Sequence, residues 1–372
     1  MRKTVWYWAA IGTLAACFTC GAAAQDTDKN VPQIENARIE KRILAESLAT
    51  EAKQWMERAD RAQWLGYAAP QIGGDRTMCC GDSGGSWGNG CGRCRLEDGD
   101  RGSNMRSSDG GTATLERPRN LVVLLRAENK RVTKIRVVSE ECTLDAGNLT
   151  LTWLTGVKPA ESVELLQGFV RGADLDGGET QHTAHTAHAA LTAIAMHADG
   201  AADRALVSFT QPEQPASLRR QAAFWLGEAR GKAGLAALEK MARTDPSSEV
   251  RAQVTFALSV SHEPGAVEEM IRMAHEDESS HVRGQALFWL AHKAGQKAVG
   301  AITGAIENDP DTDVKKKAVF ALSQLPKDEG VPKLIEVAQT NHNREVRKQA
   351  MFWLGQSNDP RALAFFEKML TQ

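Results

Sequence analysis

The sequence lacks an excess of charge of either sign. Its 45 Lys and Arg residues are balanced by 47 Asp and Glu residues, which gives a formal net charge of −2 over 372 residues. A protein that binds nucleic acid or an anionic membrane normally gathers Lys and Arg on one surface, whereas both signs intersperse along this chain. The composition therefore argues against nucleic acid and against an acidic membrane as partners.

A hydrophobic run long enough to stay in a membrane is also absent from the N-terminal region. The apolar stretch 5–18 is shorter than the roughly 20 residues that a membrane-spanning helix requires. It follows Arg2 and Lys3 and precedes three alanines at 22–24, the small residues of a signal-peptidase site. We therefore expect residues 1–24 to be a signal peptide and the protein to be exported, to the periplasm or outside the cell.

An alternative interpretation of the same segment is a lipoprotein signal. Residues 14–17 read LAAC, so Cys17 could become a lipid-carrying first residue that anchors the protein to a membrane. Phe18 is bulky for the position after that cysteine, and we prefer simple cleavage. Both interpretations place the protein outside the cytoplasm.

Histidine is absent before position 182, and this absence excludes one kind of catalysis. Residues 80–85 read CGDSGG, which resembles the segment around the nucleophilic serine of trypsin-like proteases. That family needs a His base and a buried Asp, both of which come well before the serine in the chain. Ser83 has no such base, so we interpret the segment as a Gly-rich turn held by its cysteines.

A 32-residue repeat fills the C-terminal part of the chain. The segments that begin at residues 221, 253, 285, 317 and 349 read QAAFWLG, QVTFALS, QALFWLA, KAVFALS and QAMFWLG. A fixed period of this length indicates stacked supersecondary units. Each unit contains two stretches with apolar residues at helical spacing, so the sequence predicts an α-α solenoid of helical hairpins over residues 158–372.

The first helix of each unit, which we name helix A, carries an unusually wide apolar arc. Around Val250, Val254 and Leu258 this arc covers roughly 200°, about twice the stripe of a surface helix. One position within it alternates in size along the array: Trp225, Ala257, Trp289, Ala321 and Trp353. We expect the three Trp side chains to be buried between layers, each facing the Ala of its neighbour, rather than to form an exposed ligand-binding stripe.

Two polar rows accompany the arc. The first consists of basic residues near the start of each helix A: Arg219, Arg251, Arg283, Lys315 and Arg347. Six residues before the basic residue of the next unit stand Asp245, Asp277, Asp309 and Asn341. We expect each of these loop acceptors to bind the basic side chain that follows it. The second row contains Gln221, Gln253, Gln285 and Gln349, for which we expect a hydrogen-bonded ladder interrupted by Lys317.

The loops between units carry a recognisable motif. Residues 245–251 read DPSSEVR, a DP-x3-VR pattern, and near matches are DPDTDVK at 309–315 and ESSHVR at 278–283. In this motif and in their period the units resemble HEAT-like repeats of the phycobilisome-lyase type. The resemblance implies a helical scaffold whose extended surface binds another protein, and it does not assign a reaction.

Two enzyme families have similar repeats and supply the alternative function, a metal-dependent or lyase-type enzyme. Deoxyhypusine hydroxylases resemble this array but bind two irons through His-Glu pairs at the start of helix A. The corresponding pairs here are 220–221, 252–253, 284–285, 316–317 and 348–349, and they contain no His or Glu. His262-Glu263 and His275-Glu276 fall in a loop and at a helix end. Phycobilin lyases are the second family, supported by repeat similarity alone. We therefore expect a non-catalytic scaffold without a cofactor or metal.

The region before the repeats has a different composition. Beyond a polar linker, residues 34–64 show helical spacing in Ile39, Ile43, Leu48 and Ala52, which predicts an amphipathic helix within the segment 25–64. Four glutamates along it argue against a membrane-surface helix. Residues 65–157 alternate in a β pattern, with a hairpin over 121–138 that turns at Glu128-Asn129 and a further strand over 149–154.

This small N-terminal β-rich module contains five cysteines: Cys79, Cys80, Cys91, Cys94 and Cys142. The C-x-x-C pair formed by Cys91 and Cys94 has roughly the spacing of a zinc knuckle. Export favours oxidation, so we prefer disulfides, and the odd count leaves one thiol free or paired between chains. No His follows Cys94, so the attachment pattern of c-type haem is absent.

The two ends of the helical array carry residues that could serve binding. At its start, His182, His185 and His188 are spaced by three, so two imidazoles could share a metal ion. We prefer the interpretation that they form a packed or solvent-facing cap.

At the C-terminal end of the array, Phe365 stands where other units have Ala, Glu or Lys, beside Phe366. A final repeat normally turns polar. We therefore expect Phe365 and Phe366 to lie on a surface used for self-association or partner docking, the alternative being that Phe365 packs on Met351 or Phe352.

Overall fold

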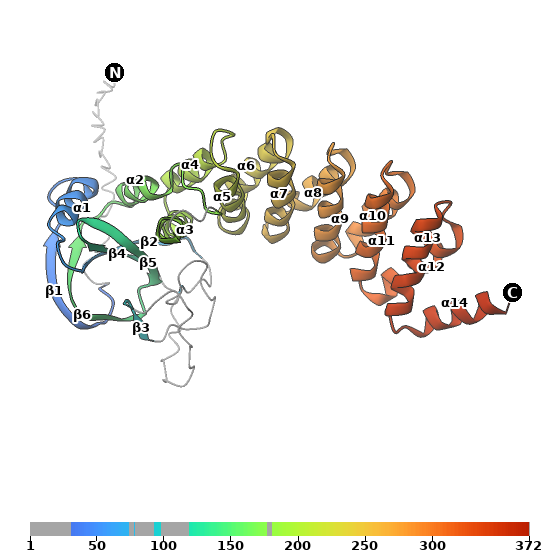
Figure 1. Ribbon diagram of the computed structural model, residues 1–372, viewed down its shortest axis with the longest axis horizontal. Coiled ribbons are helices and arrows are strands. Elements are labelled where there is room, and N and C mark those ends of the chain that lie inside the picture. Colours follow the sequence, from blue (N-terminus) through green and yellow to red (C-terminus); the bar gives the residue numbers. More distant parts are fainter. Residues whose placement is uncertain (1–30, 74–77, 79–92, 98–118, 177–180, 372) are drawn as a thin grey trace, which may run out of the picture.

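The computed structural model describes residues 31–73, 78, 93–97, 119–176 and 181–371. A β-sheet with three helices on it stands at one end of an elongated molecule, and a row of helical hairpins extends from it to the C-terminus (Figure 1). Among the described residues no helix is long and apolar enough to cross a membrane.

The sheet has the strand order β1-β6-β2-β4-β5, and β3 pairs with the first part of β6. β6 runs parallel to β1, β2 and β3, whereas β4 is antiparallel to β2 and to β5. The strands and the first helix are β1 (Ile34–Ile43), α1 (Leu48–Glu57), β2 (Gln63–Pro70), β3 (Arg93–Arg95), β4 (Asn120–Glu128), β5 (Arg131–Ser139) and β6 (Thr143–Thr155).

The predicted hairpin is confirmed. β4 and β5 pair along their length, and the two turn residues Asn129 and Lys130 have φ angles of 51° and 59°. Two successive residues in the left-handed region produce a type I′ turn, whose twist matches that of the paired strands. The strand expected over 149–154 is also present, as the second half of β6.

The amphipathic helix expected within 34–64 is confirmed only for Leu48–Glu57, because 34–43 form a strand and residues 63 and 64 begin strand β2. Residues 34–43 form strand β1, which pairs with β6 from Ile34 to Ile43, and only Leu48–Glu57 is helical. Apolar residues at 39 and 43 fit a helix and also fit a strand, since both lie on the same face at period two. Pairing of nine β1 residues with β6 decides between them. The segment is therefore an integral part of the β module.

Both faces of the sheet are buried. On one face Tyr67, Val123 and Leu125 join the main core beneath α1, α2 (Pro159–Val170) and α3 (Gln181–Met196). The other face forms a separate core around Trp64 and Trp153. Gly66 is required there, because a Cβ on it would lie 2.9 Å from Leu124 Cδ2 and 3.0 Å from the Trp153 ring.

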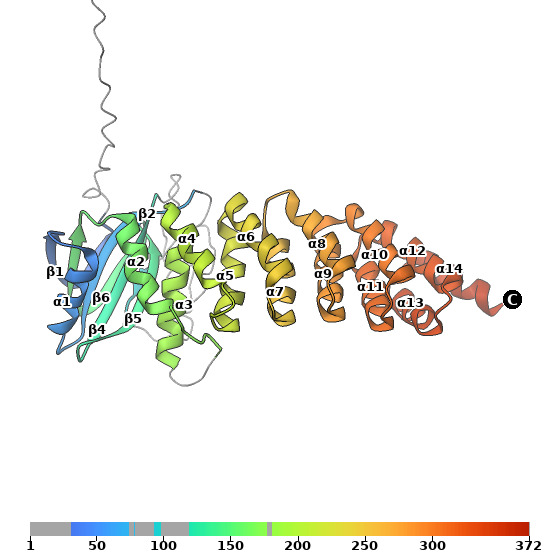
Figure 2. The same ribbon diagram turned by 90° about the horizontal axis from the view of Figure 1, so that it is seen from above.

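The helical hairpins form two layers, which Figure 2 shows side by side along the array. The A layer consists of α5 (Ala216–Ala229), α7 (Ser248–Val260), α9 (Ser280–Ala294), α11 (Thr312–Gln324) and α13 (Arg344–Gln356). The B layer consists of α6 (Gly231–Thr244), α8 (Gly265–Glu276), α10 (Gln296–Asn308), α12 (Lys327–Thr340) and α14 (Pro360–Leu370). α4 (Gly200–Phe209) pairs with α3 at the start of the array.

Asp245, Asp277 and Asn341 do bind the arginine that follows them, as expected, but through their backbone carbonyls. The carboxylates of Asp245, Asp277 and Asp309 bind the arginine of the preceding helix A instead. The Arg251 guanidinium binds the Asp277 carboxylate at the far end of its own unit (2.8 and 3.1 Å), and its Nη1 donates to the Asp245 carbonyl at the near end (2.9 Å). Arg219 and Arg283 bind Asp245 and Asp309 in the same way. The spacing of six residues between Asp245 and Arg251 had suggested that the carboxylate of the nearer loop binds the guanidinium. The side chain spans both loops because each helix A packs directly against the next.

The β module and the helical array are joined by a buried polar chain. Nδ1 of His197 lies 2.6 Å from the Ala193 carbonyl, Nε2 lies 2.8 Å from Ser162 Oγ, and Ser162 Oγ lies 2.9 Å from the Tyr67 hydroxyl. Because a carbonyl can only accept, Nδ1 carries the proton and Nε2 accepts from Ser162. The three side chains are fully buried, and they connect β2, α2 and the end of α3.

Candidate binding face of the solenoid

The three Trp side chains are not equally buried. Trp225 is 4% exposed, as expected, but Trp289 and Trp353 are only partly buried, so the expectation of burial between layers is wrong for these two. The Trp289 ring packs at 4.8 Å on the ring of Phe256. Phe256 precedes Ala257 and points further towards solvent, and it supplies the contact that we had assigned to Ala257.

These contacts belong to a continuous row of rings along the A layer. Phe recurs one residue before the alternating position in every unit, and the Phe and Trp rings together form contacts within and between neighbouring A helices. Successive centroid distances lie between 4.8 and 5.9 Å through the row Trp225, Phe224, Phe256, Trp289, Phe288, Phe320, Trp353 and Phe352. Most of these rings are partly exposed, and Phe352 is 55% exposed. The row therefore forms an aromatic stripe on the surface.

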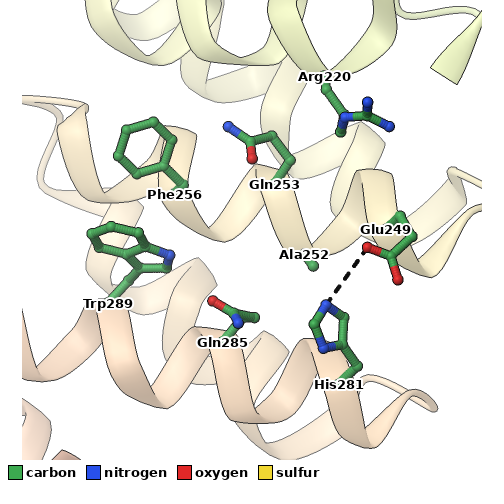
Figure 3. Close-up of a pocket in the computed structure, with 8 residues that line it drawn as sticks. All are labelled: Arg220, Glu249, Ala252, Gln253, Phe256, His281, Gln285 and Trp289. Carbon is green, nitrogen blue, oxygen red and sulfur yellow. Dashed lines mark ion pairs between the residues drawn. The ribbon is translucent and has the colours of Figure 1, made fainter. Parts of the chain in front are cut away.

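A groove of about 640 Å³ opens beside this stripe. Figure 3 shows its walls: Arg220 from α5, Glu249, Gln253 and Phe256 from α7, and His281, Gln285 and Trp289 from α9. All the lining residues belong to A helices, so the groove lies on the surface of the A layer that the B helices do not cover. We name this surface the A face.

The glutamines of the repeat line the A face without forming the expected ladder. Gln221, Gln253, Gln285 and Gln349 are described and partly exposed, and none of these four side chains hydrogen-bonds to another residue of the described chain. In Figure 3 the amides of Gln253 and Gln285 stand on two neighbouring helices at the groove. Each amide therefore keeps donor and acceptor capacity for a ligand.

Lys317 takes the place of glutamine in the fourth unit and reaches over its neighbour. Its side chain lies across α9 above Gly284, where an added Cβ would come within 2.4 Å of Lys317 Cδ. Lys316 and Lys348, which flank the same row, form ion pairs with Asp313 and Glu345 on their own helices. The row on the A face thus reads Gln, Gln, Gln, Lys, Gln.

The groove also contains an ion pair. His281 Nε2 lies 3.8 Å from a Glu249 carboxylate oxygen, the ion pair drawn in Figure 3. None of the residues that line the groove is a Ser, Thr, Cys, Lys or Tyr that this histidine could activate as a nucleophile. Exposed rings, amides and a guanidinium can instead contact apolar and peptide groups.

The candidate metal residues do not converge. Among the described residues no group of three or more His, Cys, Asp or Glu side chains could hold a metal ion. His185 and His188 lie on α3, and His197 at its end is committed to Ser162 and Ala193. His262 lies in the loop before α8 and His275 near the end of that helix.

The described cysteines lie in the second core of the β module. Cys94 on β3 and Cys142 before β6 are both buried, and both are disulfide-bonded in the structure. Cys79, Cys80 and Cys91 lie outside the described residues. The pairing therefore stays a prediction.

The surface assigned to Phe365 must be corrected. Its side chain is 6% exposed and belongs to the main core, and its ring lies 5.4 Å from that of Phe366, which is partly buried. α14 turns this residue inward because Phe365 follows Ala362 by three, on the apolar side of the helix. The exposed apolar residues near this end are Phe352, Leu363, Met369 and Leu370.

The A face and the two-layer array define a helical-repeat protein. Residues 204–291 and 300–372 match the HEAT repeats family, so the array consists of HEAT repeats. No curated protein matches the chain.

Solved structures with a similar arrangement share little sequence with the chain. The CpcE–CpcF complex of phycocyanin lyase from Nostoc sp. PCC7120 is 22% identical with a TM-score of 0.32, over 42% of this chain and 99% of that one. Human deoxyhypusine hydroxylase in complex with glycerol is 18% identical with a TM-score of 0.24, over 56% and 90%. A structure of Kap95p with RanGDP is 18% identical with a TM-score of 0.36, over 54% of this chain and 30% of that one.

The aromatic stripe was missed by reasoning on the sequence. Phe occurs at 224, 256, 288, 320 and 352, in all five units and directly before the alternating Trp or Ala. Invariance alone does not mark it as a surface position, because the Leu two residues later is equally invariant and is buried in every unit. The sequence pattern therefore did not separate this row from the core.

Proposed function

We propose that the protein is an extracytoplasmic interaction scaffold that binds an extended segment of another protein along its A face. The observation that carries the proposal is the parallel arrangement of an aromatic stripe and a row of side-chain amides that bind no other residue in the described part of the chain. Rings supply apolar contact area, and each glutamine can pair with one peptide group of a bound backbone.

The spacing of the repeat suits an extended chain. Neighbouring packed helices stand about 8–10 Å apart, and an extended strand advances about 3.3 Å per residue. A segment that crosses the A helices would therefore place about three residues on each unit and meet one Phe and one Gln per step. Lys317 would favour an acidic residue at the fourth unit, since it forms no ion pair within the described chain.

Selection from a random-peptide display library tests this function. Peptides enriched on the wild-type protein should lose binding to Gln253→Ala/Gln285→Ala, by about tenfold or more if each lost hydrogen bond contributes about 1 kcal/mol. The double variant should fold normally, because these amides make no hydrogen bond to any described residue. Phe256→Ser/Phe288→Ser should also lose binding.

Val267→Ser/Ile335→Ser is the matched control, since these partly buried residues lie on the B helices α8 and α12. It should retain the selected peptides. Peptides that bind all variants alike, or a library that yields none, would contradict the proposal.

The location outside the cytoplasm is also a proposal, because residues 1–24 lie outside the described chain. The apolar run and the alanines before Gln25 support it. Residues 1–30 fused to alkaline phosphatase should give an active enzyme, which requires export. Cys17→Ser should leave that activity unchanged and should abolish membrane attachment only if the lipoprotein alternative is correct.

The domain division follows as a proposal from the same observations. We propose a signal peptide, a β module that includes the segment from β1 onwards, and a helical array that begins with α2 at Pro159. Disulfides within the module suit the oxidising environment outside the cytoplasm.

A further inference from the structure

Three helices of the array end in the same way. α3, α7 and α11 are related by steps of 64 residues, and the backbone N–H groups of His197, Ser261 and Leu325 each donate to the carbonyl three residues earlier, at 3.2, 3.3 and 3.3 Å. The last carbonyl groups of a helix have no partner within it and carry the negative end of the helix dipole. Each end therefore presents two equivalent carbonyls, one at the second-last position and one at the capping residue.

Two of these ends receive hydrogen bonds from a cation at the C-terminal end of the next helix A, Arg230 directly after α5 and Lys293 on α9. Nη1 of Arg230 donates to the carbonyls of Ala195 and His197 at 3.1 and 2.8 Å. Nζ of Lys293 donates to the carbonyls of Ser259 and Ser261 at 2.8 and 2.6 Å. The same pair of carbonyls, 64 residues apart, thus accepts a guanidinium in one place and an ammonium in the other.

At the third end, no cationic side chain of the described residues donates to the two carbonyls. The residue 64 positions after Lys293 is Ser357, whose hydroxyl donates to the Leu354 carbonyl on its own helix at 2.7 Å. Within the described residues, the carbonyls of Ser323 and Leu325 receive no hydrogen bond. A pocket of about 190 Å³ lies at this place, and its lining includes Ser323, Leu325, Trp353, Gln356 and Ser357.

We propose that this pocket, which we name the α11 end pocket, binds a primary ammonium group on an alkyl chain. The two carbonyls would accept its hydrogen bonds as those of Ser259 and Ser261 accept the bonds of Lys293. The Trp353 ring that borders the pocket adds a cation–π surface and covers the alkyl stem. Lys327 also borders it, and the carboxylates of Asp328 and Glu329 follow directly in the first turn of α12.

Two sources have this chemistry: a lysine side chain of a partner protein and a small alkylamine. Trp353 belongs both to this pocket and to the aromatic stripe, but none of the lining residues lines the groove between α5, α7 and α9, where the peptide-binding variants are placed. Failure of the peptide selection would therefore not contradict ammonium binding at the α11 end pocket. Failure of ammonium binding would likewise not contradict peptide binding at the groove.

Titration with n-butylammonium chloride, followed by the indole N–H signals in NMR spectra, tests the site. The signal of Trp353, identified by its loss in Trp353→Phe, should shift saturably with a Kd in the millimolar range. Ser357→Lys supplies the ammonium from within, as Lys293 does at the α7 end, and should weaken butylammonium binding at least tenfold. Lys293→Ser is the converse variant and should create a second butylammonium site, reported by the Trp289 signal.

The peptide acetyl-Gly-Lys-Gly-amide separates the two sources. Binding at least tenfold tighter than that of butylammonium indicates a partner lysine, and equal or weaker binding indicates a free amine. A Trp353 signal that does not shift, or one that shifts equally in Ser357→Lys and with potassium chloride alone, overturns the proposal. If Ser357→Lys does not fold, the second site expected in Lys293→Ser decides the matter.

Discussion

The ring of Phe256 lies 4.8 Å from that of Trp289, centroid to centroid, and so links α7 to α9 at the surface of the A layer. Phe320 and Trp353 repeat this contact at 4.9 Å one pair of units later. The large residue of the alternating position therefore packs on a ring that is itself partly exposed. The side chains that we propose for partner binding therefore also pack the A layer.

This arrangement predicts unequal costs for removing the tryptophans. Trp225→Ala should lower the free energy of unfolding by about 3–5 kcal/mol, because a buried side chain leaves a cavity. Trp289→Ala should cost less than half as much, since part of its ring already contacts water. Urea denaturation of both variants measures the difference. Equal losses, or iodide quenching that spares Trp289, would contradict the burial seen here.

The repeat architecture could be predicted from the sequence because its period, its two helices per unit and its polar loop motif are all local patterns. The hairpin β4–β5 was also predictable, from alternation and an Asn-containing turn. β1 was not, because residues 34–43 fit two periods and only the distant strand β6 decides between them. The A face was half predictable: the Gln row was visible, whereas the invariant Phe row was not distinguished from the core.

The carboxylate that each arginine binds could not be predicted from the sequence for a similar reason. Arg251 is six residues from Asp245 and 26 from Asp277, and proximity in the chain favoured the first. The structure gives Arg251 the Asp245 carbonyl and the Asp277 carboxylate. Which group of a loop meets a side chain depends on how far one helix is displaced along the next, and no local pattern encodes that displacement.

Removing one carboxylate from this row should be costly. Asp277→Ala leaves the buried guanidinium of Arg251 without its bidentate partner and should lower the free energy of unfolding by about 3–5 kcal/mol. Asp313→Ala is the control, because it breaks an exposed pair with Lys316 and should cost less than about 1 kcal/mol. Thermal or urea denaturation of both proteins gives the comparison, and similar losses would refute a structural role for the buried pair.

The buried chain at the junction predicts a dependence of stability on pH. Burial lowers the pKa of His197 to about 4, below its ordinary value of 6.5. The imidazole of His197 therefore binds a proton more tightly in the unfolded chain than in the folded protein. Above about pH 6.5 it is neutral in both states, and its full contribution to the free energy of unfolding is present. This contribution is lost as the pH falls from there towards 4, by about 3 kcal/mol in all.

Comparison with His197→Gln isolates this contribution from the other groups that titrate in the same range. The difference in unfolding free energy between wild type and variant should be constant above about pH 7 and should shrink between about pH 6.5 and 4. A difference that does not vary with pH would show that His197 keeps its ordinary pKa in the folded protein.

The cysteines of the β module supply a further prediction. We expect at least one disulfide to join the Cys79/Cys80 segment to Cys91, Cys94 or Cys142, and to contribute a few kcal/mol by restricting the unfolded chain. Peptide mapping by mass spectrometry of protein from the periplasm, without reduction, identifies the pairs. Five alkylated thiols in that protein, or a stoichiometric zinc ion, would overturn the assignment.

Substitutions at two residues of the last helix, α14, test core packing and docking separately. Phe365 is buried against the core, so Phe365→Glu should lower the thermal midpoint, with a loss of about 2–4 kcal/mol from placing a carboxylate in an apolar site. Leu370 on the same helix is 87% exposed, so Leu370→Glu should leave the midpoint within about one degree. If this end also docks a second copy or a partner, Leu370→Glu should reduce association in sedimentation experiments while the fold is unchanged. A midpoint that barely moves in Phe365→Glu would show instead that its ring is not part of the core, and association unaffected by Leu370→Glu would remove this surface from the candidates for docking.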